Sequence, residues 1–274
     1  MRLRGYNATI VWLASMGVVT AITCVVVVTF GVLARPELVV LALLAWAISN
    51  LVAVWALRGN HRDGVRLNND AVILITNGDI ERANAKLHAA VTRVFPRDVA
   101  AMALFNQGVV AVRTHDLETA KTRSRESVAM SSGFRLTRAH GLYEGLARAQ
   151  LAFACAVTGD LDEADACLAK LDEPGSASPL AIAFAVRARA TVAHRRGRFE
   201  DVVAITDAER ALLRNALAHN DAVLAEATRA YALSRLGDAY RAAARTTPPI
   251  YADDLARDYV RSMLPETLSV LAHP

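Results

Sequence analysis

Residues 78–83 read Gly78-Asp79-Ile80-Glu81-Arg82-Ala83, and the chain returns to this pattern four more times. Successive copies begin 37, 44, 38 and 40 residues apart. A nearly fixed period in this range is typical of stacked repeats, in which each unit buries its apolar faces against its neighbours. The other copies are His115-Asp116-Leu117-Glu118-Thr119-Ala120, Gly159-Asp160-Leu161-Asp162-Glu163-Ala164, Gly197-Arg198-Phe199-Glu200-Asp201-Val202 and Gly237-Asp238-Ala239-Tyr240-Arg241-Ala242.

Each copy has the chemistry of a turn between two helices. Glycine can end the first helix because it adopts the left-handed conformation without a Cβ penalty. The aspartate that follows it can cap the second helix by accepting hydrogen bonds from the free N–H groups. Acidic residues in the next positions, such as Glu81 and Glu163, lie favourably against the dipole of the second helix. The aspartates are therefore interpreted as helix caps, with no part in catalysis.

The remaining sequence between the turns favours helices. Alanine, leucine and arginine prevail, and no window shows the sustained alternation expected of strands. Thr246-Thr247-Pro248-Pro249 ends the last pair, and a final helix over 251–263 is expected to stop before Pro265. The expected pairs are 66–77 with 80–94, 98–113 with 117–131, 136–157 with 161–171, 180–195 with 199–217, and 220–235 with 238–245.

This spacing resembles the tetratricopeptide repeat, a helix–turn–helix unit of about 34 residues. The resemblance covers about residues 66–245, and whether the fifth copy is a true repeat stays open. It implies an all-α, right-handed α-solenoid of about five repeats, whose first helices line a concave surface. In that family a small residue stands seven positions before the turn glycine; here these positions hold Ala71, Gly108, Ala152, Ala190 and Ala230.

The N-terminal part differs from the rest of the chain in composition, because it is almost free of charged residues. Residues 5–34 and 38–57 contain no Asp, Glu, Lys or Arg, and only Arg35-Pro36-Glu37 separates them. A helix of about 20 apolar residues crosses a bilayer, so the sequence predicts a membrane hairpin, with residues 8–33 and 38–57 in the lipid. The expected domains are the hairpin at 1–57, a juxtamembrane linker at 58–65 and the repeat domain at 66–274.

Two alternatives to this hairpin are open. It could be buried inside a water-soluble protein, or the first run could be a signal peptide cleaved after Val32-Leu33-Ala34, although that run is about twice the usual length. Arginines flank the hairpin at both outer ends, which places the N-terminus and the repeat domain in the cytoplasm. Ser15, Gly17 and Ala21 fit close packing within the hairpin, or homo-oligomerisation of the spans.

The charge distribution and the absence of known motifs limit the classes of function that we expect for this chain. The net charge of +4 is spread along the chain, without the single-sign clustering that nucleic acid requires. Three scattered cysteines and seven dispersed histidines give no metal-ligand set, and no catalytic or cofactor motif is found. Arginine far outnumbers lysine, which together with abundant alanine indicates a bacterial protein. We therefore expect no cofactor, no metal and no enzymatic activity; a divergent enzyme is the least favoured class.

The first helices are expected to carry the binding surface. A basic floor that takes a carboxylate or an acidic peptide could be formed by Arg187, His194, Arg195 and Arg235, since guanidinium pairs with carboxylate in a fork. The alternative is that they form an ordinary solvated face. The expected function is a scaffold on the bacterial cytoplasmic membrane that binds a protein or peptide; a structural subunit of a transport or secretion complex is the second candidate. The candidate groove residues are Asn106, Arg113, Gln150, Arg187, His194, Arg195, Tyr231 and Arg235.

Overall fold

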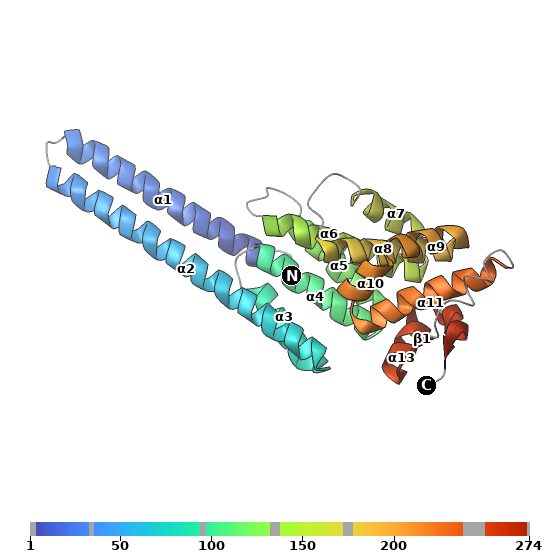
Figure 1. Ribbon diagram of the computed structural model, residues 1–274. Coiled ribbons are helices and arrows are strands. Elements are labelled where there is room, and N and C mark those ends of the chain that lie inside the picture. The colour runs from blue at the N-terminus through green and yellow to red at the C-terminus, as the bar shows by residue number, and fades with distance from the viewer. Residues whose placement is uncertain are drawn as a thin grey trace. The chain divides into compact units, whose positions relative to one another are not determined.

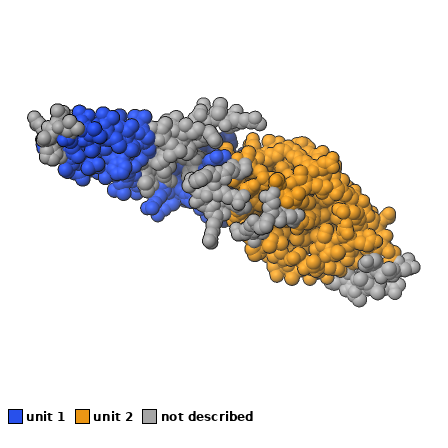
Figure 2. Space-filling model, turned by 90° about the horizontal axis from the view of Figure 1, so that it is seen from above, with its two compact units in different colours: residues 1–103 blue, residues 104–274 orange. Residues whose placement is uncertain are grey.

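The computed structural model is all-α apart from one pair of two-residue strands in its described part. Two compact units divide the chain, residues 1–103 and 104–274 (Figure 2). This boundary differs from the expected domain limits at residues 57 and 65, because one continuous helix runs through both of those points. The structure describes residues 4–32, 36–93, 97–131, 138–171, 178–237 and 250–272.

The first unit contains two long helices that lie side by side, α1 (Arg4–Val32) and α2 (Pro36–Thr76) (Figure 1). Residues 58–65, predicted to be a linker, are helical although they include two glycines of low helix propensity, and Gly64 is buried. The C-terminal part of α2 packs against α3 (Ile80–Arg93), and the seam is filled by side chains of Ala71, Ala83 and Leu87 that are fully buried.

The expected membrane spans fall mainly on α1 and α2. Over the part of the chain that the structure describes, no helix combines the length and the apolar character needed to cross a membrane.

The second unit is a succession of helices packed in chain order. The expected helix over 199–217 is broken at Glu209, whose ψ of 20° leaves the helical range, and the expected helix over 238–245 lies outside the described residues. The elements are α4 (Arg97–Arg113, which begins in the first unit), α5 (Leu117–Ser131), α6 (Arg138–Thr158), α7 (Leu161–Ala169), α8 (Pro179–Arg195), α9 (Phe199–Ala208), α10 (Arg210–Ala216), α11 (His219–Arg235), β1 (Ile250–Tyr251), α13 (Asp254–Met263), η1 (Pro265–Val270) and β2 (Leu271–Ala272).

The repeated hexapeptide forms the same turn in its first four copies, and the fifth is described only at Gly237. The first residue of all five copies has a positive φ, between 63° at His115 and 93° at Gly159. In four copies the backbone makes a Schellman motif: at Gly78 the amide donates to the carbonyl of Ile75, and that of Asp79 donates to Leu74. The expectation that these glycines end helices in the left-handed conformation is confirmed, and His115 adopts it too.

The aspartates that follow the turns do not all behave alike. Asp79 and Asp116 accept the backbone N–H three residues later at 3.2 and 3.0 Å, as predicted for helix caps. Asp160 does not cap α7: its carboxylate lies 2.8 Å from the ammonium of Lys121 instead. Lys121 on α5 is only 5% exposed, and a buried ammonium needs a counter-charge. The Asp160 carboxylate therefore pairs with Lys121 and does not accept from the N–H groups of α7.

The C-terminal segment, residues 250–272, folds back onto the second unit. Its helix α13 lies beside α11 (Figure 1), and the parallel strands β1 and β2 tie the two ends of the segment together. Val260, Met263 and Leu264 are completely buried. These residues share one core with α6, α8 and α11, so the segment is part of the fold rather than an appended tail.

Candidate binding face

The face expected to bind a partner is formed by the helices that precede the turns, α4, α6, α8 and α11. We call it the first-helix face. Apolar side chains from these helices, including Phe153, Val192 and Ala227, form one core with Tyr259 and Met263 of α13. The C-terminal segment therefore covers a large part of the first-helix face.

At the centre of this contact lies a buried cationic site. Arg187 on α8 is 3% exposed and is ion-paired with Asp221 on α11. Its guanidinium carbon lies 3.9 Å from the ring centroid of Phe153 and 4.7 Å from that of Phe184, which is cation–π geometry. The hydroxyl of Tyr259 donates to Asp221 at 2.5 Å, so the C-terminal helix completes the site. Burial raises the pKa of Tyr259 well above its usual value, and the negative charge of Asp221 adds to this.

A second polar contact joins the face to η1. The Glu266 carboxylate lies 2.7 Å from Nε2 of His194 and 3.3 Å from Nη1 of Arg195. Nη2 of Arg195 also donates to the carbonyls of Val157 at 3.0 Å and Met263 at 3.2 Å. The side chains of α8 thus form a socket for one carboxylate, and the chain supplies that carboxylate itself.

The protonation states in this socket follow from its burial. Burial lowers the pKa of His194 below the ordinary 6.5, and the hydrogen bond with Glu266 only partly offsets it. Burial alone would raise the pKa of Glu266, but its backbone amide, His194 and Arg195 together hold that pKa below the ordinary 4.5. Near pH 7 a neutral imidazole therefore donates its Nε2–H to a charged carboxylate.

The structure corrects the expected exposure of the groove residues. Gln150, Arg187 and His194 were predicted to face solvent, but they are 1%, 3% and 6% exposed. Arg195 is half-buried and engaged with Glu266. His194 and Arg195 are held by Glu266 of the C-terminal segment, and Arg187 lies against Phe153, Phe184 and Asp221, with Tyr259 of that segment bonded to Asp221.

Gln150 is buried for a different reason, its position between α4 and α5. A Cβ at residue 108 would lie 2.6 Å from Nε2 of Gln150 and 3.2 Å from the hydroxyl of Ser124, so a larger residue there would require the Gln150 side chain to move. This close approach fits a small residue at the corresponding position of the second copy, Gly108. Within the described residues, neither end of the Gln150 carboxamide has a hydrogen-bond partner.

The remaining predicted groove residues lie nearer the surface. Asn106 and Tyr231 are half-buried, whereas Arg113 and Arg235 are exposed. Tyr231 forms an aromatic cluster with His194 at 5.3 Å and Phe199 at 6.0 Å, and Arg235 lies over the Phe199 ring. The structure brings Arg187, His194, Arg195 and Tyr231 to one region, around the C-terminal segment.

Sequence reasoning missed the residues that complete this site. Asp221, Tyr259 and Glu266 are not on the exposed positions that the repeat resemblance assigns to the groove. A signal was present in α13, where Ala256, Tyr259 and Met263 recur at helical spacing and all prove buried. That apolar stripe requires a partner surface, but the sequence does not say which helices provide it.

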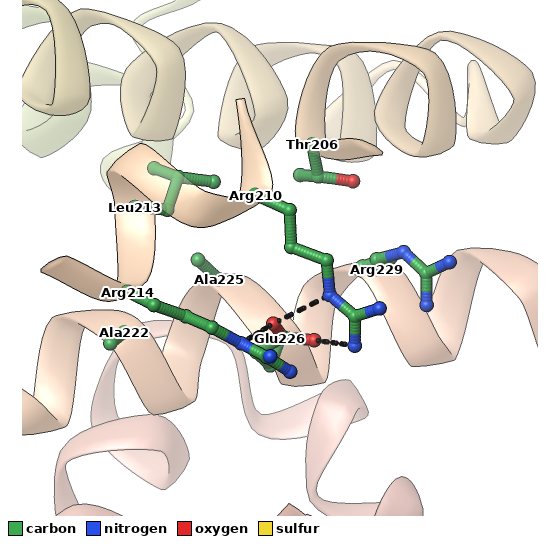
Figure 3. A pocket seen from close by; sticks show the side chains of 8 residues that line it. All are labelled: Thr206, Arg210, Leu213, Arg214, Ala222, Ala225, Glu226 and Arg229. Carbon is green, nitrogen blue, oxygen red and sulfur yellow. Dashed lines mark hydrogen bonds and ion pairs between the residues drawn. The ribbon is translucent and has the colours of Figure 1, made fainter. Parts of the chain in front are cut away.

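Figure 3 shows a second polar cluster, between α9, α10 and α11. Arg210 donates two hydrogen bonds of 2.9 Å to the Glu226 carboxylate, and Arg214 donates one of 2.8 Å to the same carboxylate. Arg229, at the edge of this hollow, is paired with Asp207. The remaining space is about 10 Å³, room for about one water molecule, so this cluster joins helices and does not bind a ligand.

A shallow cleft of about 360 Å³ lies between α7, α8 and α9. Its charged lining consists of two acidic residues, Asp165 and Asp201, and two basic residues, Arg189 and Arg198. Asp165 is also ion-paired with Arg196, and Arg198 with Asp201. The charges are balanced within the chain, so the cleft has no excess of either sign with which to attract an ion.

The possible metal ligands and the buried Cys155 form no reactive cluster in the described part of the chain. No group of three or more His, Cys, Asp or Glu side chains is placed there to hold a metal ion. Cys155 is buried, and burial together with the nearby Glu163 carboxylate raises the pKa of its thiol to about 12. A thiol with such a pKa stays protonated and unreactive at neutral pH.

We expect the stability of the fold to fall as the pH drops below about 6.5. The unfolded chain binds a proton on His194 near pH 6.5, while the folded chain does so only at lower pH, so acid favours unfolding. Glu266 adds a second loss below about pH 4.5, because its pKa is lowered in the folded state. The measurement is the free energy of unfolding by urea between pH 7.5 and 3.5.

His194→Gln isolates the histidine contribution, since glutamine can donate to Glu266 but does not titrate. The wild type should lose up to about 1.4 kcal/mol more per pH unit than this variant over its titration range. His219→Gln is the matched control, because the His219 side chain is 63% exposed. Equal pH slopes for wild type and His194→Gln would contradict the assignment.

No protein-family model, no curated protein and no solved structure matches this chain. The likeness to the tetratricopeptide repeat thus remains a likeness of spacing and turn geometry.

Proposed function

We propose that this protein is a membrane-anchored helical-repeat scaffold that holds a protein partner at the cytoplasmic face of a bacterial membrane. The α1–α2 hairpin is the anchor, and the second unit is the recognition domain, built as a right-handed solenoid of tetratricopeptide-like pairs. Anchoring raises the effective concentration of partner and scaffold at the membrane, so modest affinity suffices. No catalytic step is proposed.

The apolar surface of the hairpin supports the anchor. Of its described side chains, Val25, Val28, Leu51 and Trp55 are between 64% and 77% exposed. Exposed apolar surface of this extent is unfavourable in water and marks a membrane or protein interaction site. The charge-free runs of the sequence also continue beyond the described side chains, through residues 5–15 and 33–34.

The carboxylate socket supports the recognition role and is the observation on which this proposal mainly rests. His194 and Arg195 on α8 hold Glu266 of the C-terminal segment, and the helices of that segment pack against α11. The first-helix face therefore has the chemistry to receive an acidic helical segment. We propose that a partner presents the same chemistry, a carboxylate on an amphipathic helix, and competes with residues 250–272.

Alkaline carbonate extraction of membranes from expressing bacterial cells tests the anchor. The full chain should stay in the membrane pellet, as an integral protein does. Release into the supernatant would contradict anchoring through the hairpin. Protease added outside intact cells should leave the second unit uncut, and cutting there would reverse the proposed topology.

Site-specific crosslinking in membranes tests the recognition role. A photo-crosslinking residue replaces the exposed Arg235, beside the aromatic cluster of Tyr231 and Phe199. Glu266→Gln weakens the internal occupant and should increase the crosslinked partner, whereas Arg195→Gln weakens the socket and should decrease it. The same yield in wild type and both variants would contradict recognition through this socket.

A structural subunit of a larger membrane complex is the second candidate. The observation that favours it is the cover on the first-helix face, since a face closed by its own chain has less need of a transient partner. In that case the chain should co-purify in fixed stoichiometry with the complex, and Glu266→Gln should leave that stoichiometry unchanged.

A further inference from the structure

One face of α2 continues past the apolar run as a line of exposed aromatic and cationic side chains. Trp55 is 77% exposed, and Arg58, Arg62 and Arg66 follow it on exposed positions. Residues three and four apart lie on the same face of a helix. We call these four residues the tryptophan–arginine face.

The opposite side of α2 is buried against its neighbours in the first unit, α3 among them. Gly64, Asn68 and Ala71 are buried, whereas Arg62 and Arg66 point away from that seam. Asp63 is the sole acidic residue between Arg58 and Arg66, and it projects about 100° away from Arg62 around the helix. Within the described part of the chain, Arg58 and Arg62 form no ion pair. The charge of Arg66 is the smallest of the causes that lower the pKa of Asp70. The cationic charge of this face is therefore directed to solvent.

We propose that the tryptophan–arginine face binds the headgroups of anionic phospholipids. This inference rests on the proposed anchoring of the α1–α2 hairpin. Trp55 lies at the end of the expected apolar span, and tryptophan prefers the boundary between hydrocarbon and headgroups. The guanidinium that follows is suited to phosphate because it can donate two parallel hydrogen bonds to its oxygens.

The continuity of α2 fixes the depth of each arginine. With a rise of about 1.5 Å per residue, Arg62 lies about 6 Å and Arg66 about 12 Å beyond Arg58 along the helix. The headgroup layer is about 5–8 Å thick on each side of the membrane. Arg58 and Arg62 therefore reach the phosphates, while Arg66 acts only through the screened surface potential. A flexible linker at 58–65 would impose no such order.

A single-tryptophan variant reports on the lipids around this face. Trp12→Phe and Trp46→Phe leave Trp55 as the only tryptophan. The full chain is reconstituted into vesicles of equal parts phosphatidylcholine and phosphatidylglycerol, in which either one or the other lipid carries bromine. Bromine quenches tryptophan fluorescence at contact, so the ratio of the two quenching signals gives the enrichment of the anionic lipid.

We expect brominated phosphatidylglycerol to be enriched about fivefold for each arginine within the headgroup layer. Arg58→Gln and Arg62→Gln should each reduce the enrichment, and Arg66→Gln should change it least. Arg82→Gln is the matched control, because this exposed arginine lies on α3 and is already paired with Asp79. Raising the salt concentration should lower the enrichment in the wild-type sequence.

The outcomes separate this inference from the anchor. Equal quenching by the two brominated lipids would overturn lipid selection while leaving the anchor intact. An absence of quenching by both lipids would overturn the anchor itself, and this inference with it. Equal losses from all three arginine variants would contradict the depth order set by a continuous α2.

Discussion

Replacing Arg187 with methionine lowers the free energy of unfolding by about 3–5 kcal/mol, the cost of breaking one side of a buried ion pair. The arginine is ion-paired with Asp221 and stacked on Phe153. Methionine fills much of the volume but leaves the Asp221 carboxylate without its counter-charge in a site that Tyr259 closes. Urea unfolding of the full chain, followed by circular dichroism, measures the loss.

A double variant distinguishes the charge effect from simple loss of packing. Arg187→Met combined with Asp221→Asn removes both charges and keeps an oxygen that accepts from Tyr259. The free energy of unfolding of this double variant should be roughly 1–3 kcal/mol higher than that of Arg187→Met alone, because the two residues interact directly. Arg261→Ala serves as control and should change stability by less than about 0.5 kcal/mol, because its pair with Asp258 is 61% exposed on both sides. A double variant no more stable than the single one would contradict the buried-charge explanation.

Replacing Leu264 with alanine is the second change with a large expected effect, a loss of about 2–5 kcal/mol in one cooperative transition. Leu264 is completely buried and belongs to the same core as α6, α8 and α11. The truncation leaves a cavity in that shared core, so the C-terminal segment and the second unit should lose stability together. Thermal unfolding recorded in parallel by circular dichroism and by hydrogen exchange of α13 and α8 measures this.

Leu255→Ala is the matched control, since Leu255 lies on the same segment but is 69% exposed. It should change the unfolding midpoint little. The contrary result for Leu264→Ala is fast exchange confined to residues 250–272 with an unchanged midpoint elsewhere. That result would make the segment a releasable lid on the first-helix face instead of part of the core.

The repeated turns could be predicted because their cause is local. A left-handed residue at the end of a helix is a property of one or two positions, and Gly159 with Asp160 specifies it without help from distant residues. Helix pairing follows from these turns, and small residues such as Ala83 and Ala164 mark where helices approach closely. The failure of Asp160 to cap α7 is already a tertiary effect, because Lys121 comes from another pair.

Long-range contacts decided the candidate site. Arg187, His194 and Arg195 are ordinary exposed positions if one considers α8 alone, and the sequence predicted them so. Asp221, the partner of Arg187, is 34 residues away in the chain, and Glu266 is 72 residues away from His194, so no local pattern indicates these pairings. The sequence predicted a basic floor that takes a carboxylate from a partner; in the structure, the carboxylate that contacts His194 and Arg195 is Glu266 of the chain itself.

The sequence by itself determined the all-helical class, the positions of the turns and the two charge-free N-terminal runs, because each depends on residues close together in the chain. The tertiary structure alone decided that α2 continues through residues 58–65, and that the C-terminal segment covers the first-helix face. The physical reason is that an apolar stripe, such as that of α13, must be buried but can be buried on any complementary surface. Which surface it takes is settled by packing and by matched charges such as Glu266 with Arg195.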